Sequence, residues 1–298
     1  MREDASGSRL ATIAVVAVAA VLVVPAPVYG AGRERAQSAH DTDPSKAATA
    51  NCPGGQVVIG AGGRIKGGDG GVILDAVIPR RTSVTVRGAA YPDHDSSWSV
   101  IAAAVCELES SGPGVTIESG TTTATCPNGT DLSGSGFDLP TGSVLTGLIP
   151  DPAVGDVTVR TPSIVIGGGG PTAYAVCVPE LRPTYSTRFE ADSPHDASAP
   201  KSVTAGGVSD TSYPHLSGVG ATITWADHGP GLSPIRSDVF IDTLMPTADL
   251  TGVVVEAVDR TPPSGSPGGS ERSGGAPAVG PDDGQWSVTG YGINAYYY

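Results

Sequence analysis

The group best suited to chemistry is Asp93-His94-Asp95, in which two carboxylates flank an imidazole. Such a group could bind a metal ion or tune a general base. However, neighbouring side chains of an extended chain point in different directions, and the triplet falls between two predicted strands, so a solvated loop is the favoured interpretation. We keep Asp93, His94 and Asp95 as weak catalytic candidates, and we predict no metal site and no cofactor.

Two glycine-rich stretches resemble ligand-binding loops, but turns explain both better. Gly60-Ala-Gly-Gly63 is not followed by a predicted helix whose N-terminus could hold a phosphate. Gly67-Gly-Asp-Gly-Gly71 occurs once, whereas calcium-binding Gly/Asp turns are stacked in series. The chain contains neither a Gly-x-Ser-x-Gly nucleophile elbow nor a His-Glu-x-x-His zinc motif. These observations favour a protein without a catalytic centre.

A threefold internal repeat organises the elements that would position any site. Its landmarks are two glycines separated by one residue, a short apolar run ending in proline, a segment that alternates apolar and polar residues, and a closing strand. The glycine pairs are Gly60/Gly62, Gly134/Gly136 and Gly218/Gly220, and the prolines are Pro79, Pro150 and Pro246. Because the landmarks recur in the same order, they indicate three homologous modules.

Each landmark has the composition of a β-strand. The runs are short, rich in Val, Ile and Thr, and bounded by Gly, Pro and Asp. The predicted fold is therefore all-β, with three homologous modules of about four antiparallel strands each in a pseudo-threefold arrangement. A β-sandwich or another all-β repeat assembly is the alternative.

Small residues recur in the closing strands. The same two positions of the modules are occupied by Ala102 and Ala104, Ala173 and Ala175, and Gly290 and Gly292. Strands disfavour Ala and Gly unless another part of the chain approaches closely. We therefore expect these positions to face a crowded interior, and we expect Ala103, on the opposite face, to tolerate a larger side chain.

The N-terminus has the layout of a secretory signal peptide. A polar start with Arg2 and Arg9 precedes the apolar run from Leu10 to Val24 and a small-residue region that ends near Gly30. The run is shorter than the roughly 20 residues of a membrane-spanning helix. We expect residues 1–30 to be removed, and the mature protein to be extracellular and without a membrane anchor.

Four cysteines in an exported chain predict two disulfides. Cys52 and Cys106 open and close the first module, and Cys126 and Cys177 take the same places in the second. If the modules are alike, each pair closes within its own module. A zinc site made of all four is disfavoured, because the spacings of 54, 20 and 51 residues lack the close pairs of structural zinc sites.

Composition sets the remaining boundaries. The expected order is a flexible lead-in (31–50), a first module (51–109), a second module (125–181), a linker (182–207) and a third module without cysteines (208–298). Inside the third module, residues 261–284 have the Gly/Pro/Ser composition of a disordered insertion.

The formal net charge of −13 bears on the partners. Nucleic acids and anionic membranes are bound through clustered Lys and Arg, so we expect neither as a partner of the mature protein. Acidic surfaces commonly serve solubility, and the charge alone does not identify a cationic partner.

The module resembles one found in uncharacterised secreted proteins of high-GC Gram-positive bacteria. The resemblance covers most of residues 50–298 and is carried by Cys52-Pro53-Gly54-Gly55, Gly60-x-Gly62, Trp98 through Cys106, Cys126-Pro127-Asn128-Gly129, Tyr174-Ala-Val-Cys177 and Trp286 through Ile293. Three such units also look like the β-prism of vitelline outer-layer proteins and some lectins. The resemblance implies an architecture and no activity.

Three matched units on an exported β scaffold favour a non-catalytic binding or structural protein, because an enzyme site is usually asymmetric. A glycan or another component of the cell envelope is the expected partner. The alternatives are a secreted hydrolase that uses loop carboxylates such as Asp93 or Asp95, and an inhibitor or interaction protein with 261–284 as its variable arm.

Deleting residues 261–284 should leave the fold intact, because their composition offers no core residues. We expect the melting temperature of the deletion variant to lie within a few degrees of the parent value in a thermal melt. A large loss of stability would mean that the segment packs against the modules.

Overall fold

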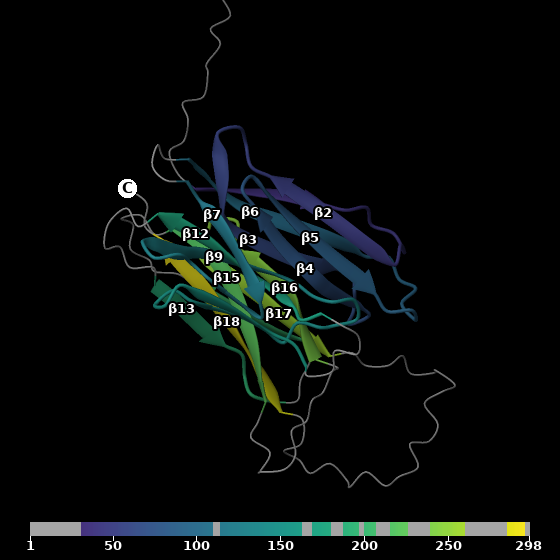
Figure 1. The fold of residues 1–298 in the computed structure, drawn as a ribbon. Coiled ribbons are helices and arrows are strands. Elements are labelled where there is room, and N and C mark those ends of the chain that lie inside the picture. The colour runs from purple at the N-terminus through teal and green to yellow at the C-terminus, as the bar shows by residue number, and fades with distance from the viewer. Residues whose placement is uncertain are drawn as a thin grey trace, which may run out of the picture.

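The computed structural model describes residues 31–109, 114–162, 169–179, 187–196, 200–206, 215–225, 239–259 and 285–295. Within these ranges the regular structure consists of 18 β-strands and no helix (Figure 1). The all-β prediction is therefore confirmed. The predicted signal peptide, 1–30, and the predicted insertion, 261–284, lie outside the described residues.

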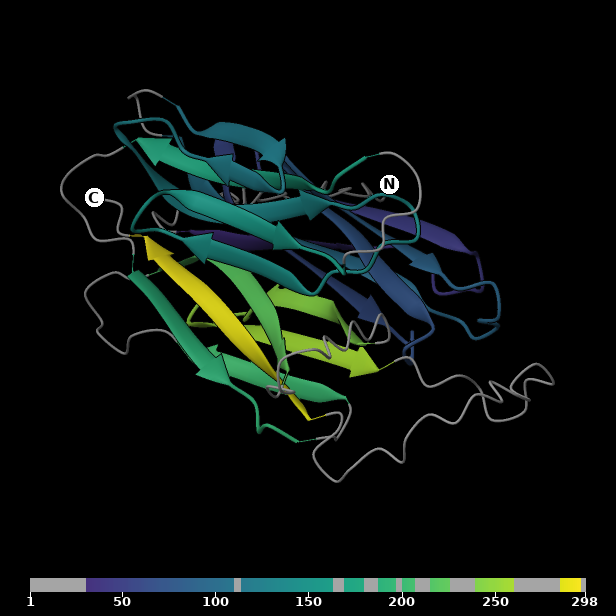
Figure 2. The same cartoon turned by 60° about the horizontal axis from the view of Figure 1, so that its bottom comes forward.

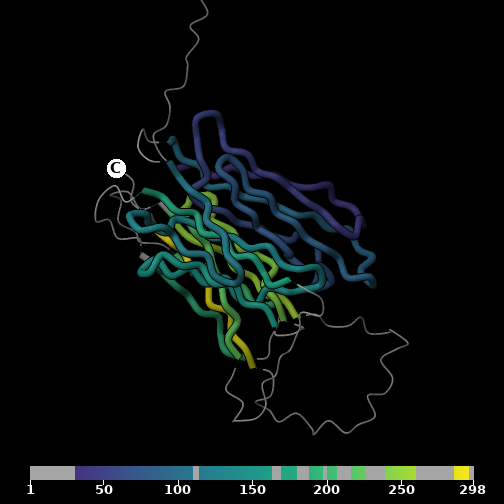
Figure 3. The backbone as a smooth tube through the Cα atoms, in the orientation of Figure 1, coloured from purple at the N-terminus to yellow at the C-terminus, as the bar shows by residue number. Residues whose placement is uncertain are grey.

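The strands form three consecutive groups of six, here called the first, second and third segments, which can be followed by colour in Figure 3. The first segment contains β1 (Gly32–Gln37), β2 (Ser45–Asn51), β3 (Gln56–Lys66), β4 (Val72–Arg80), β5 (Ser83–Ala90) and β6 (Ser99–Leu108). The second contains β7 (Thr116–Thr121), β8 (Thr123–Thr125), β9 (Thr130–Asp138), β10 (Gly147–Asp151), β11 (Asp156–Arg160) and β12 (Thr172–Pro179). The third contains β13 (Thr187–Asp192), β14 (Lys201–Gly206), β15 (His215–Trp225), β16 (Val239–Pro246), β17 (Gly252–Asp259) and β18 (Trp286–Ala295).

Three six-stranded antiparallel sheets are each built from two segments. The first sheet has the order β1-β6-β3-β16-β17-β14, the second β2-β5-β4-β9-β12-β7 and the third β13-β18-β15-β10-β11-β8. In Figure 2, for example, the yellow β18 lies between the green strands β13 and β15 of the third sheet. In every sheet the first, sixth and third strands of one segment meet the fourth, fifth and second strands of another. Consequently no segment completes a sheet alone, and the three segments close into a ring.

The three segments touch through the first glycine of each pair, which lies on β3, β9 or β15. A Cβ atom at this glycine would meet a backbone carbonyl oxygen of another segment. That oxygen belongs to the residue just before the corresponding glycine of the other segment. The pairs are Gly60 with Ser217, Gly134 with Ile59 at 2.8 Å, and Gly218 with Ser133 at 2.7 Å. Contacts below about 3 Å leave no room for a methyl group, so only glycine fits at these positions.

The second glycine of each pair lies against the proline that ends the apolar run of another segment. The pairs are Gly62 with Pro246, Gly136 with Pro79 and Gly220 with Pro150. Two landmarks that recur separately in the sequence therefore meet in space, at the boundary between segments.

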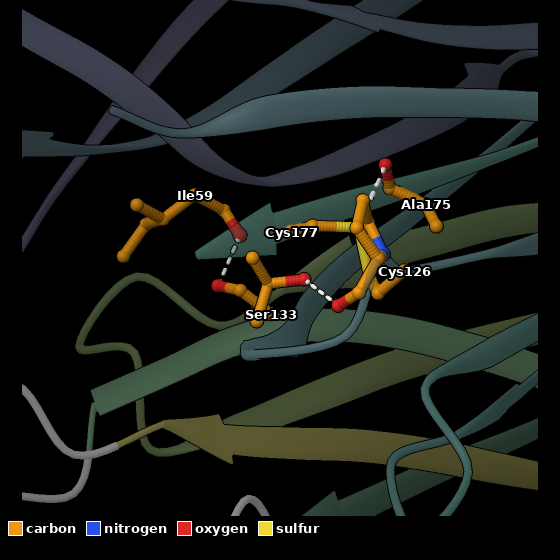
Figure 4. Close-up of a disulfide and its surroundings, with 7 residues drawn as sticks. Ile59, Cys126, Ser133, Ala175 and Cys177 are labelled. Carbon is orange, nitrogen blue, oxygen red and sulfur yellow. Dashed lines mark hydrogen bonds between the residues drawn. A yellow bond between two sulfur atoms is a disulfide. The ribbon is translucent and has the colours of Figure 1, made fainter. Parts of the chain in front are cut away.

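Both predicted disulfides are confirmed. Cys52–Cys106 and Cys126–Cys177 each span 5.6 Å between Cα atoms and join the end of one module to its beginning. Closing a loop of this size stabilises a fold by about 4 kcal/mol. Figure 4 shows the second disulfide beside a contact between segments, in which the Ser133 hydroxyl donates to the Ile59 carbonyl oxygen at 2.7 Å.

Two stretches predicted to be irregular are strands instead. The expected lead-in, 31–50, contains β1 and most of β2, and the expected linker, 182–207, contains β13 and β14. Their low apolar content suggested flexibility, but an edge strand needs only one small apolar face. In β2, for example, Ala48 and Ala50 are buried while Thr49 between them is exposed. Together with β7 and β8, which lie largely between the predicted first and second modules, these strands give each group six strands where about four were expected.

The small residues of the closing strands are buried as predicted, with Ala102, Ala104, Ala173 and Ala175 at 0% exposure. The expectation for Ala103 is wrong, because it is also 0% exposed. The opposite face of β6 is covered too, and there Ala103 packs with Ile101 and Met245 in a separate apolar cluster.

Two buried lysines, one in the first segment and one in the third, each pair with an acid and lie over a tryptophan ring. Lys46 pairs with Asp41 and lies 5.0 Å from the ring centroid of Trp98. Lys201 pairs with Asp196 and lies 4.8 Å from the ring centroid of Trp286. A cation desolvated over an aromatic face and neutralised by a carboxylate is stably accommodated. One of these lysines, Lys201, borders the cavity described below.

Gly60→Ala should destabilise the protein by about 1–3 kcal/mol or more, because the new methyl group must displace the Ser217 backbone. Gly206→Ala is the matched control, since nothing lies within 4 Å of the added atom. Urea unfolding measures both changes. Equal stability of the two variants would contradict the close contact between segments.

Candidate functional site

A cavity of about 480 Å³ opens on the first sheet, at the junction of the first and third segments. Its volume lies within the range of small-molecule sites. It is lined by Arg64, Ile65 and Lys66 at the end of β3, the turn residues Gly67 to Gly70, Pro200, Lys201 and Ser202 around the start of β14, Asp242 on β16, and Glu256, Val258 and Asp259 on β17.

A β-bulge places an acid in this wall. The register of β16 against β17 shifts between Ile241 and Thr243, so that Asp242 is the extra residue. The next residue, Thr243, pairs with Glu256 on one side and with Arg64 on the other. Bulges re-aim side chains and are common beside functional sites. Here the bulge adds a second carboxylate next to an arginine and a glutamate.

Glu256 is held by two neighbours. The Thr243 hydroxyl donates to Glu256 Oε2 at 3.0 Å, and Arg64 Nη2 lies 3.7 Å from the same oxygen. Both partners lie on strands, so this carboxylate has a defined position in the wall of the cavity.

Two polar atoms of the lining residues are left without a partner. Arg64 Nε, a donor, and Asp242 Oδ1, an acceptor, are shielded from solvent and make no hydrogen bond within the described structure. Buried polar groups are nearly always paired, so each exception calls for an explanation.

The pKa of Asp242 is raised to about 7, first by burial and then by the negative charge of Glu256. Hydrogen bonding from Thr243 and the charge of Arg64 oppose this shift only in part. Desolvation and a like charge both disfavour the ionised form. The cavity therefore contains an acid that changes its charge near neutral pH.

The second sheet carries a related group at the corresponding place. Asp75 is the bulge residue of β4, and Arg87 on β5 lies between two acids. Its Nη2 is 2.6 Å from Asp138 Oδ1 and its Nε is 3.4 Å from Asp75 Oδ1. In the third sheet the corresponding neighbours of Gly147 are Thr222 and Arg160, and neither is an acid. The three sheets thus share the strand pairing at this place, but the bulge acid occurs only in the first two, where the arginine lies on different strands.

The predicted candidates Asp93, His94 and Asp95 lie in the connection between β5 and β6, outside the lining of the cavity. The His94 backbone N–H donates to the Tyr91 carbonyl oxygen, and its ring lies against Gly71. The ring nitrogen Nε2 is buried without a partner. In the part of the chain that the structure describes, no three His, Cys, Asp or Glu side chains gather to hold a metal ion.

Sequence inspection missed Arg64, Asp242 and Glu256, because each lies inside a strand. One signal was available. Asp75 and Asp242 interrupt two apolar runs at the same position, four residues before the terminal proline. A recurring acid in an otherwise apolar strand indicates a bulge or a site.

A comparison with models of protein families gave no match, and a search of curated proteins gave none either. No helix of the described residues is long and apolar enough to cross a membrane.

Asp242→Asn should stabilise the protein most at alkaline pH. Because its pKa is about 7 in the folded state and about 4 in an unfolded chain, folded Asp242 keeps a proton that the unfolded chain has lost. Its contribution is complete below about pH 4 and is lost as the pH rises through about 7. Asparagine stays neutral, so the melting temperature of the variant should gain on the parent between these values.

Thermal melts from about pH 4 to about pH 8 follow this gain. Asp95→Asn, at an exposed carboxylate, is the control. A difference between Asp242→Asn and the parent that stays constant with pH would contradict the raised pKa of Asp242.

Proposed function

We propose that the protein is a secreted, non-catalytic binding protein that holds a carbohydrate in the cavity of the first sheet. Export is supported by the predicted signal peptide together with two disulfides, which persist in oxidising compartments. We further infer that the scaffold is a β-prism-like assembly of three homologous modules, since each segment makes the same set of strand pairings with its neighbours.

The pair of unpartnered atoms in the lining carries the proposal for the ligand. Arg64 Nε needs an acceptor and Asp242 Oδ1 needs a donor. A hydroxyl group is both, and adjacent hydroxyls on a sugar ring present both functions at once. A hydroxyl-rich ligand is therefore the class of ligand whose groups match both atoms.

The rest of the lining supports a polar ligand. Side chains of both signs border the cavity, with Arg64 and Lys66 among the cations and Asp69, Glu256 and Asp259 among the anions. The key groups are held on strands, which limits their reorganisation on binding. The volume of about 480 Å³ is sufficient for one or two sugar rings.

One observation favours a hydrolase as the second candidate. Asp242 and Glu256 share the cavity, and a carboxyl with a pKa of about 7 is suited to proton transfer near neutral pH. This activity would use strand residues and not the loop carboxylates Asp93 and Asp95. Release of reducing ends from a bound glycan would distinguish it from binding alone.

Ser202→Trp should block the cavity, because Ser202 lines it from the exposed face of β14. Thr204→Trp, two residues along the same exposed face and outside the lining, is the matched control. We expect the mature protein and Thr204→Trp to bind the same glycans on a glycan and cell-wall array, and Ser202→Trp to lose them.

The array also tests the proposal as a whole. If the parent protein binds no glycan, the proposed function is wrong. If both tryptophan variants bind as the parent does, the carbohydrate site is elsewhere.

A further inference from the structure

Asp242 lacks a partner that the corresponding acid of the second sheet has. There, the Arg87 guanidinium reaches both Asp138 and Asp75, so one cation serves two carboxylates. Burial raises the pKa of Asp75, and the charge and hydrogen bond of Arg87 oppose that shift. The second sheet therefore shows how a bulge acid, Asp75, is paired with an arginine, and Asp242 can be compared with it.

In the first sheet the arginine and the acid have exchanged strands. Position 64 on β3 is an arginine where β9 has Asp138, and position 256 on β17 is a glutamate where β5 has Arg87. Arg64 approaches Glu256 through Nη2, and its Nε remains unpartnered together with Asp242 Oδ1. Within the described residues, Arg64 thus forms an ion pair with Glu256 and none with the bulge acid.

Neither lysine of the lining replaces the arginine partner of the bulge acid. Lys66 is exposed at the end of β3 and is not among the charges that shift the pKa of Asp242. Lys201 Nζ is bound to Asp196 and donates to the Pro194 carbonyl oxygen at 3.1 Å, at the corner of the ring. The raised pKa of Asp242 agrees with this account, since Arg64 is the one cation that opposes the shift. The acid is consequently under-compensated in the described structure.

We propose, building on the carbohydrate site above, that the ligand is an amino sugar with a free amine. Its ammonium group would donate to Asp242, and a neighbouring hydroxyl would accept from Arg64 Nε. An ammonium group has three donors and no acceptor, and its hydrogen bond to a carboxylate is stronger than one between neutral groups. The ligand would supply the charge that Arg87 supplies in the second sheet.

The charge of the protein favours the same class of ligand. A net charge of −13 attracts a cation and speeds its encounter with the cavity. A sugar acid would instead bring a third carboxylate beside Asp242 and Glu256 and would be repelled. An acetylated amine is neutral and would leave Asp242 without a counter-charge.

Titration calorimetry near pH 7 with three tetrasaccharides tests the inference on the mature protein. The probes are the glucosamine tetramer, the N-acetylglucosamine tetramer and cellotetraose, which differ mainly in the group at carbon 2. We expect the glucosamine tetramer to bind about tenfold more tightly than the other two, as a charge-assisted hydrogen bond implies.

Asp242→Asn removes the charge at nearly constant shape and should abolish this preference while leaving the weaker binding of the neutral probes. Asp75→Asn, at the bulge of the second sheet, removes the same charge outside the cavity and should retain the preference. Thermal melts of both variants report that they are folded.

The outcomes separate the two proposals. If no glycan binds in the array or in calorimetry, the carbohydrate site itself is wrong. If the neutral probes bind as tightly as the glucosamine tetramer, the amino-sugar inference is overturned and the carbohydrate site stands. If Asp242→Asn keeps the preference, or Asp75→Asn loses it, the total charge and not Asp242 selects the amine, and the inference is equally overturned.

Discussion

The contact of three glycines with three backbone carbonyls is the constraint on which the structure depends. Gly60, Gly134 and Gly218 each lie against the backbone of another segment so closely that a Cβ atom has no space. This approach brings β3, β9 and β15 together, and the prolines that end the neighbouring runs then pack on the second glycines. Core residues such as Val, Ala and Leu fill the space between the sheets, but these glycines determine how near the sheets can come.

Closing the ring also creates the site. Because the third strand of one segment pairs with the fourth strand of another, Arg64 comes from the first segment while Asp242 and Glu256 come from the third. Neither segment has this group alone. The second sheet makes the corresponding junction with Asp75, Arg87 and Asp138, and there one guanidinium contacts both carboxylates. In the second sheet the arginine contacts the bulge acid, whereas in the first sheet it does not. The difference lies in which strand holds the arginine.

Much of the fold could be predicted from recurring residues, whereas the site could not. The glycine pairs, the prolines and the cysteines mark places where backbones or sulfurs meet, so geometry requires those residue types. The edge strands β2 and β14 lack such a requirement, so their composition predicts irregular chain. Their signal was the shared spacing of Asp41 and Lys46 with Asp196 and Lys201, which a search for apolar runs does not detect. Asp242 was hidden for another reason: a bulge depends on pairing between segments distant in sequence.

The central claim is that the ligand binds at the junction of the first sheet, where Asp242 has no arginine partner. A crystal structure of the mature protein with the glucosamine tetramer would test this claim most directly. We expect a sugar in the cavity of the first sheet, with its amine beside Asp242 Oδ1 and a hydroxyl beside Arg64 Nε, and none at the Asp75 junction of the second sheet. A sugar bound at all three junctions, or on a surface away from β3, β16 and β17, would contradict it.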